Sequence, residues 1–209
     1  MAMQSVGPVG AHELSEANGW PSQGYWRYED YLRLPSDGKR YEIIEGVLYV
    51  ANAPSLEHQF TVSEIHFHLK LFVREQQLGQ VFTAPLEVHL SERSRPVQPD
   101  VLFIRAERQP PVGAAFLTGA PDLIVEVISP SSIRLDRKTK FDAYEEAGVA
   151  EYWIADPKTR SVEVYTLAHG EYALHGQYTG DEIVESVLLQ GLRVKTSLLF
   201  QTPPTNLTA

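Results

Sequence analysis

A single glutamate, Glu126, stands inside the apolar run "PDLIVEVISPSS". The β-branched residues around it are typical of a strand that is buried on both faces of a sheet. A carboxylate in such a strand needs a cationic partner, a proton or a metal ion, because burying an isolated charge is costly. Glu126 is therefore the first candidate for chemistry in this chain.

A second acid, Asp100, opens another apolar run, "QPDVLFI". If the two runs form neighbouring strands, the two carboxylates repel each other unless a cation lies between them. Such hard oxygen ligands suit Mg²⁺ or Mn²⁺, which bind through one or two carboxylates and keep water molecules for a phosphate substrate. We therefore expect a site for Mg²⁺ or Mn²⁺ at Asp100 and Glu126.

A lysine follows in the predicted helix "SIRLDRKTKFDAYEEAG", where Asp136, Lys140 and Tyr144 are spaced by four residues. This spacing sets Lys140 beside the apolar stripe that faces the sheet, and brings a cation to the edge of the acidic site. Two acids, a metal ion and a lysine are the minimum for metal-assisted phosphodiester cleavage. The alternative is a solvated lysine paired with Asp136. We expect removal of Lys140 to change stability by no more than about 0.5 kcal/mol, as for a surface residue.

The elements that must position these residues follow from periodicity. Apolar residues at helical spacing predict a helix over residues 56–77, and Glu45-Gly46 predicts the turn of a hairpin. The segments "QVFTAPLEVHL" and "PDVLFIRA" are predicted strands, and two more strands flank Asp156-Pro157. This order of helices and strands indicates a mixed sheet with helices packed on it.

Length and composition restrict the possibilities. A chain of 209 residues with 43% hydrophobic content suits one globular domain, and we assign residues 1–23 to a mobile leader and 24–209 to a single domain. The absence of cysteine excludes disulfides and thiolate zinc sites. No apolar run approaches the ~18 residues of a membrane span, so we expect a soluble cytoplasmic protein with no membrane partner. The net charge of −9 argues against a broad electrostatic footprint on nucleic acid.

Several blocks together resemble a known family. They are "RYEIIEG", the histidine His58, "QPDVLFI", "PDLIVEVISPSS" and "DRKTKFDAYEEAGVAEYWIADP". In their joint spacing, from about residue 40 to residue 156, the chain is similar to the Uma-type restriction-endonuclease family, a bacterial branch of the PD-(D/E)XK nuclease superfamily. The resemblance implies a restriction-endonuclease-like α/β fold, a mixed β-sheet flanked by helices, and a divalent-metal-dependent endonuclease that hydrolyses DNA.

The resemblance also implies roles for individual residues. Asp100 would be the motif aspartate and Glu126 the motif acid, the main-chain carbonyl of Val127 would be a further metal ligand, and Glu42 an additional acid. Ile128 stands where the superfamily has its lysine, which makes Lys140 the replacement. If Lys140 takes that role, its ammonium group should point along the sheet face toward Glu126. The possible accessory residues are His58, Asp122 and Asp136.

Partners and alternative functions remain open at this point. Two cuts in a duplex are most simply made by two sites related by a two-fold axis, so we expect a homodimer, with Tyr165 and Tyr172 as candidates for its interface. One alternative function is a catalytically idle interaction protein that keeps the fold, favoured by the net charge and the displaced lysine. Another is a small-molecule phosphoester hydrolase, which requires a closed pocket over Glu126.

Overall fold

The computed structural model describes residues 19–51 and 53–201 of the chain. Its helices are α1 (Tyr28–Tyr31), α2 (Leu56–Glu75) and α3 (Phe141–Ala147), with 3₁₀ segments η2 (Ala106–Arg108) and η4 (Thr196–Leu199) and a π-helical segment η3 (Leu135–Lys140). Its strands are β1 (Arg40–Ile44), β2 (Val47–Ala51), β3 (Gly79–Thr83), β4 (Val88–His89), β5 (Val101–Arg105), β6 (Leu117–Thr118), β7 (Leu123–Val127), β8 (Glu151–Asp156), β9 (Ser161–Ala168), β10 (Glu171–Thr179), β11 (Ile183–Glu185) and β12 (Arg193–Lys195).

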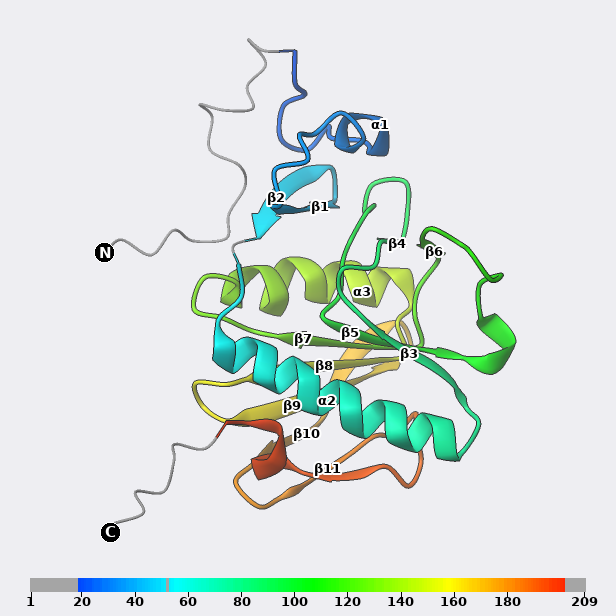
Figure 1. The fold of residues 1–209 in the computed structure, drawn as a ribbon, viewed down its shortest axis with the longest axis vertical. Coiled ribbons are helices and arrows are strands. Elements are labelled where there is room, and N and C mark those ends of the chain that lie inside the picture. The colour runs from blue at the N-terminus through cyan, green and yellow to red at the C-terminus, as the bar shows by residue number, and fades with distance from the viewer. Residues whose placement is uncertain (1–18, 52, 202–209) are drawn as a thin grey trace.

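Six strands form one mixed sheet in the order β10-β9-β8-β7-β5-β3. Strands β7 and β8 are parallel, and the other neighbouring pairs of this sheet are antiparallel. Helices α2 and α3 cover opposite faces of the sheet, as Figure 1 shows. The predicted architecture, a mixed sheet flanked by helices, is confirmed.

The central strand β7 alternates as its sequence predicts. Leu123, Val125 and Val127 join the core on the α2 side of the sheet, whereas Ile124 joins the core on the α3 side. Because side chains alternate along a strand, Glu126 shares the face of Ile124. Both faces of β7 are covered, so the Glu126 carboxylate is removed from solvent.

Helix α2 begins at a polar cap and turns one apolar stripe to the sheet. The Ser55 hydroxyl accepts a hydrogen bond from the His58 amide at 3.2 Å, which satisfies a backbone donor of the first turn. The buried residues of α2 recur every fourth position: Thr61, Ile65, Leu69 and Val73. The helix predicted over residues 56–77 is confirmed with its end at Glu75. Within the described residues, no helix has the length and apolar character to cross a membrane.

The second predicted helix has an unexpected start. It opens with the π-helical segment η3, which contains both Asp136 and Lys140, and becomes α-helical only at Phe141. Its predicted stop is confirmed, because Gly148 has φ +84° and closes α3 with its amide on the last turn. Single π-helical turns inside helices are frequent at functional sites.

The predicted hairpin is confirmed at Glu45-Gly46. Both residues have positive φ, 51° and 71°, which is the geometry of a two-residue hairpin turn. A Cβ at Gly46 would also collide with the carbonyl oxygen of Gly24. Glycine is therefore required here, and the hairpin is fastened to the segment before α1.

Two other parts of the chain differ from their predictions. The expected strand "QVFTAPLEVHL" is split into β3 and β4, because Pro85 cannot donate a ladder hydrogen bond. The predicted leader of residues 1–23 lies outside the described residues as far as residue 18. In its described end, Trp20 stacks on Trp26 at 5.4 Å and the Gln23 side chain accepts the Leu48 amide at 2.8 Å. The single domain over residues 24–209 stays a prediction.

Candidate functional site

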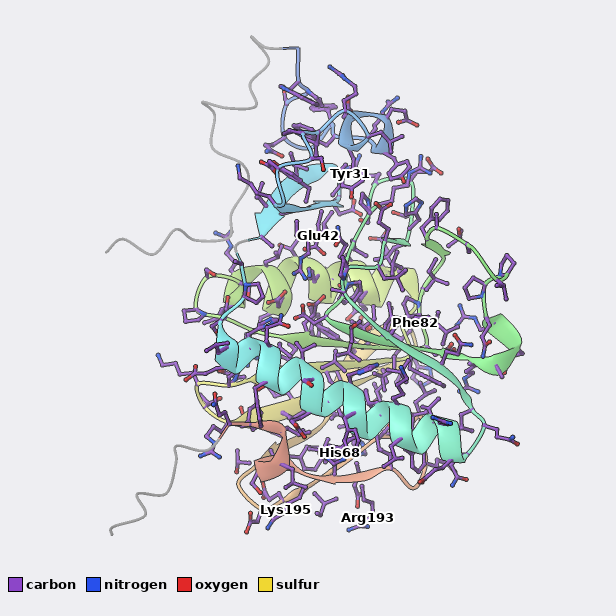
Figure 2. The ribbon with its side chains drawn as sticks, in the orientation of Figure 1. Tyr31, Glu42, His68, Phe82, Arg193 and Lys195 are labelled. Atoms are coloured by element: carbon purple, nitrogen blue, oxygen red, sulfur yellow. The ribbon has the colours of Figure 1, made fainter. Side chains whose placement is uncertain are left out.

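A group of charged side chains gathers on the α3 side of the sheet, beneath the hairpin. Figure 2 labels one of its members, Glu42, between the hairpin and α3. The members are Arg40, Glu42, Asp100, Glu126, Asp136 and Lys140, and we call them the carboxylate cluster. They come from β1, from the residue before β5, from β7 and from η3, so the cluster exists only in the folded chain.

Glu126 is the most deeply placed acid of the cluster. Its side chain is 1% exposed, and its Oε1 accepts hydrogen bonds from Lys140 Nζ at 2.9 Å and from the Tyr144 hydroxyl at 2.6 Å. Burial raises the pKa of Glu126 well above its usual range, and the charges of neighbouring acids add to this effect against the opposing charge of Lys140. The predicted upward shift is confirmed.

Lys140 is buried, which corrects the expectation of a surface residue. It is 1% exposed and its Nζ lies 2.9 Å from Glu126, 3.3 Å from Glu42 and 3.8 Å from Asp136. Burial alone would lower the pKa of Lys140, but these three carboxylates outweigh it and raise the pKa above its usual value. The predicted direction of the ammonium group, toward Glu126, is confirmed, while the expected small effect of removing it no longer has a physical basis.

Asp100 lies next to Glu126 through strand register. Val101 of β5 pairs with Val125 of β7, so extending the register by one residue sets Asp100 opposite Glu126. The Asp100 carboxylate accepts the Val127 amide at 2.9 Å and lies 3.2 Å from both Arg40 Nη1 and His58 Nε2.

These partners decide the protonation state of Asp100. Burial raises the pKa of this carboxyl, but the hydrogen bond and charge of His58, together with the charges of Arg40 and Lys140, outweigh burial and hold the pKa well below its usual value. The pKa values of Asp100 and Glu126 are thus shifted in opposite directions within one cluster, which is common where buried acids serve different roles.

Glu42 is delivered by the hairpin. The amide of Ile43 donates to the Pro96 carbonyl at 2.9 Å, which docks β1 against the segment leading to β5. The Glu42 carboxylate accepts the Gln98 amide at 2.6 Å and lies 3.3 Å from Lys140 Nζ. The hairpin therefore brings Glu42 into the carboxylate cluster.

Sequence reasoning missed two participants. Arg40 bridges Asp100 at 3.2 Å and Glu42 at 3.9 Å, and Tyr144 donates its hydroxyl to Glu126. The signal for Arg40 was present, since Arg40 and Glu42 are two residues apart in a strand and share a face. The role of Tyr144 depends on how the helix docks and had no comparable signal.

Asp122 is not part of the cluster, contrary to its accessory assignment. Its carboxylate accepts the Arg105 amide at 2.9 Å and Arg108 Nη1 at 2.8 Å. Asp122 and Glu126 share a strand face, but four residues at 3.3 Å per residue separate them by about 13 Å. Asp122 therefore joins the start of β7 to Arg105 and Arg108, away from the carboxylate cluster.

Two further predicted positions, Val127 and Ile128, directly follow Glu126 in the chain. Ile128, where the superfamily lysine would stand, is 3% exposed in the apolar core on the α3 side. Val127 contributes its amide to Asp100, while its carbonyl as a metal ligand stays a prediction.

The donor set of the cluster fits a divalent cation in charge and in chemistry. Four carboxylates face two permanently cationic side chains, so negative charge is in excess, and hard oxygen donors are those that Mg²⁺ and Mn²⁺ prefer. The same excess acts on Asp136, where burial, the largest cause, and the neighbouring acids raise the pKa to about 6. Protons therefore supply part of the positive charge that a metal ion would provide.

The present arrangement is nevertheless closed by ion pairs. Lys140 lies between Glu42 and Glu126, and Asp100 is held by Arg40 and His58. In residues 19–51 and 53–201, no three acidic or histidine side chains form an open metal-binding group. Binding an ion through these carboxylates requires them to turn away from their present partners.

Comparisons with known proteins agree with this fold. The family described as "Uma2: Putative restriction endonuclease" matches residues 28–198. A crystal structure described as "a putative nuclease belonging to DUF820 from Anabaena variabilis ATCC 29413" is similar, with a TM-score of 0.71 and 22% sequence identity over 83% of this chain and 97% of that chain. At this identity the likeness establishes the fold. No curated protein sequence matches the chain.

Proposed function

The chain belongs to the Uma2 family, and on that premise we propose that it is a divalent-metal-dependent endonuclease that hydrolyses phosphodiester bonds of DNA. One observation carries the proposal: acids from four separate segments and a buried lysine meet in one cluster with an excess of negative charge. Burying these charges costs desolvation free energy, and buried ion pairs of this kind contribute little net stability in return. We therefore attribute the arrangement to function.

Each residue has a role in this proposal. Glu42, Asp100, Glu126 and the carbonyl of Val127 would hold Mg²⁺ or Mn²⁺, and a bound ion supplies the charge that activates water and stabilises the leaving oxygen. Lys140 donates to the charged phosphoryl oxygens of the substrate. Asp136, with its pKa raised to about 6, is the carboxylate best suited to exchange a proton near neutral pH. His58 orients Asp100 through its Nε2 contact at 3.2 Å.

A second candidate function is a catalytically idle Uma2-type protein that binds partners through the same fold. The closed ion-pair network favours it, because every acid of the cluster already has a cationic neighbour. The small-molecule phosphoester hydrolase has less support. Neither of the two hollows described in the next subsection is lined by Glu126.

A nicking assay on supercoiled plasmid distinguishes the two main candidates. We expect the wild-type chain to nick DNA in Mg²⁺ or Mn²⁺ and to stop in excess chelator, and the Asp100→Asn variant, purified identically, to be inactive. The parallel purification guards against a contaminating nuclease. A wild-type protein that is inactive in both ions would favour the idle fold, and equal activity in the variant would remove Asp100 from the mechanism. An RNA of the same sequence, tested in parallel, decides between the two nucleic acids.

We still propose a homodimer, but without the interface that the sequence predicted at Tyr165 and Tyr172. Tyr165 and Tyr172 pack against Phe141 of their own chain with ring centroids 5.0 Å apart, and the Tyr172 hydroxyl donates to the Val149 carbonyl at 2.9 Å. These tyrosines are therefore committed within the fold and no longer support an interface. Light scattering at micromolar concentration tests the dimer, and a monomer there would contradict it.

A further inference from the structure

A hollow with a mixed aromatic and polar lining lies away from the carboxylate cluster, where α1 meets the loops around β4 and β6. It has a volume of about 500 Å³, within the range of small-ligand sites. Three aromatic side chains line it, Tyr28, His89 and Phe116, and Arg95 lies among them. In Figure 1 the loop that follows β4 rises toward α1, which brings these segments together.

The three rings form an ordered stack. The ring of His89 is stacked on Phe116 at 4.1 Å with an interplanar angle of 11°, and Tyr28 meets His89 edge-on at 4.5 Å. Glu87 accepts the hydroxyls of Tyr28 at 3.0 Å and Tyr31 at 2.9 Å, which fixes the orientation of both rings. Phe116 is 39% exposed, so the stack ends on an aromatic ring that is accessible to solvent.

Arg95 adds a cation to the lining of the hollow. Its guanidinium carbon lies 5.8 Å from the ring centroid of Tyr28, and its Nη2 pairs with Glu92 at 2.5 Å. Its Nε is buried and has no hydrogen-bond partner among the described residues, which is an exception to the usual pairing of buried donors. Arg95 therefore offers a ligand the charge of its guanidinium group, which Glu92 partly balances.

A second hollow of about 360 Å³ adjoins the first, since Glu92 and Arg95 line both. Arg27 and Arg93 line this second hollow, with Glu29 as a further acid, and Tyr25 on its wall is 75% exposed. Three arginines, Arg27, Arg93 and Arg95, and two glutamates, Glu29 and Glu92, line the two hollows, and Arg93 is also paired with Glu45 at 3.0 Å. The charges there nearly balance, so the exposed rings, rather than a basic surface, are the feature that suits a single nucleic-acid strand.

The hollow is linked to the carboxylate cluster by a short length of chain. Arg95 and Asp100 are five positions apart in the chain, so their Cα atoms are separated by at most about 18 Å. The Pro96 carbonyl and the Gln98 amide in this segment both bond to β1, which carries Glu42. A nucleotide held at Arg95 and a phosphate at the cluster can therefore belong to one strand.

We propose that the hollow lined by Tyr28, His89, Phe116 and Arg95 binds an unpaired nucleobase, so that the preferred substrate is DNA with single-stranded nucleotides beside the cut. The choice of a nucleotide over another flat ligand rests on the proposed nuclease function. A base stacks on an exposed aromatic face, Ser91 and Thr118 offer hydrogen bonds to its edge, and Arg95 meets its phosphate. Stacking needs no broad basic surface, which reconciles nucleic-acid binding with the acidic chain.

Binding can be measured without cleavage. Fluorescence anisotropy of a short fluorescein-labelled oligothymidylate, in excess chelator, reports affinity for a single strand, and a blunt duplex of matched length is the comparison. We expect Phe116→Ala to weaken single-strand binding about tenfold, the loss of one base–aromatic stack, and Phe116→Tyr to retain it. Phe67→Ala is the matched control, because Phe67 is 56% exposed on α2, on the other side of the sheet.

The outcomes separate this proposal from the proposed function. Single-strand affinity no greater than duplex affinity, or affinity unchanged in Phe116→Ala, would overturn the base-binding site even if the wild-type chain cleaves DNA. Single-strand binding that is lost in Phe116→Ala and kept in Phe67→Ala supports the site, even in a protein that cleaves nothing. Thermal melting of each variant confirms that the fold is intact.

Discussion

Two glutamates lie fully buried on neighbouring strands of the sheet, and their surroundings differ. Glu151 of β8 is 0% exposed and, within residues 19–51 and 53–201, accepts hydrogen bonds from neutral donors: Trp153 Nε1 at 2.7 Å, the Ser186 hydroxyl at 2.6 Å and the Leu188 amide at 2.8 Å. Glu126 of β7 is 1% exposed and is bound by a lysine among three other acids. Burial of a carboxylate is thus common to both, and the kind of partner distinguishes them.

The comparison teaches how to separate a structural acid from a functional candidate. Glu151 fastens β8 to the segment after β11 through three hydrogen bonds that engage both of its oxygens, so its carboxylate already has a role within the fold. Glu126 shares Lys140 with Glu42 and Asp136, and its neighbourhood carries more negative charge than its cations balance. An unbalanced cluster, rather than a buried acid, is the feature that calls for a metal ion or a substrate.

The largest expected effect comes from Lys140→Ala, which leaves the cluster without its central cation. Breaking a buried ion pair from one side costs about 3–5 kcal/mol, so we expect a loss of that size in the free energy of unfolding measured with urea. Lys140→Met keeps the aliphatic stem and separates charge from packing. The matched control is Lys138→Ala, a 73% exposed lysine paired with Asp142 at 2.7 Å, which should stay within about 0.5 kcal/mol. A loss of less than about 1 kcal/mol for Lys140→Ala would mean that the cluster is not held by this lysine.

Activity should divide the two glutamates next. Glu126→Gln is expected to reduce the rate of DNA cleavage by about 10²–10³-fold, the usual loss when one group that stabilises transition-state charge is removed. Glu151→Gln keeps the size of the side chain and lies outside the cluster, so cleavage at a temperature where it is folded should equal that of the wild type. Equal losses in the two variants would refute the distinction.

For stability we expect the reverse order, with a larger loss in Glu151→Gln than in Glu126→Gln. Glu151→Gln turns an NH₂ group toward a hydrogen-bond donor, and leaving such buried groups unsatisfied costs about 1–3 kcal/mol. Glu126→Gln relieves repulsion with Asp100 while Lys140 keeps two carboxylates, so we expect a change within about 1 kcal/mol. Urea unfolding of both proteins in chelator measures the difference.

The smallest effect concerns pH and metal ions. For Glu126 and Asp136 the pKa is higher in the folded than in the unfolded chain, so their contribution to stability is complete below their ordinary values near pH 4 and is lost as pH rises through the folded values, about 6 for Asp136. Asp100 acts with the opposite sign, because its lowered pKa stabilises the fold above its ordinary value and loses this effect as pH falls below it.

A melting experiment with and without Mg²⁺ or Mn²⁺ uses this dependence. A bound ion replaces the protons, so the rise in Tm should be larger at about pH 7.5 than at about pH 5.5. At tenfold excess over Kd the ion contributes about 1.4 kcal/mol, a rise of a few degrees. Asp136→Asn should flatten the pH dependence of the ion-free protein. No rise in Tm at either pH would favour the idle fold.

Local patterns determined much of this protein. Alternation in residues 123–128 fixed the face of Glu126, the periodicity of residues 56–77 fixed helix α2, and Glu45-Gly46 fixed the hairpin turn. These features were readable because each depends on side chains a few positions apart. The resemblance of the joined blocks also identified Glu42, Asp100, Glu126 and Lys140, which the fold brings into one cluster.

Only the tertiary structure determined which side chains contact one another. The sequence did not indicate that Lys140 is buried, that Tyr144 donates to Glu126, that Asp122 stays away, or that Glu151 is a buried structural acid. Each of these depends on the register between strands and on the docking of the hairpin and of α3, which bring together residues as far apart as Arg40 and Asp100. Long-range packing selects among partners that local propensity leaves equivalent, because a charged side chain is stabilised by the groups around it in space and not by its neighbours in sequence.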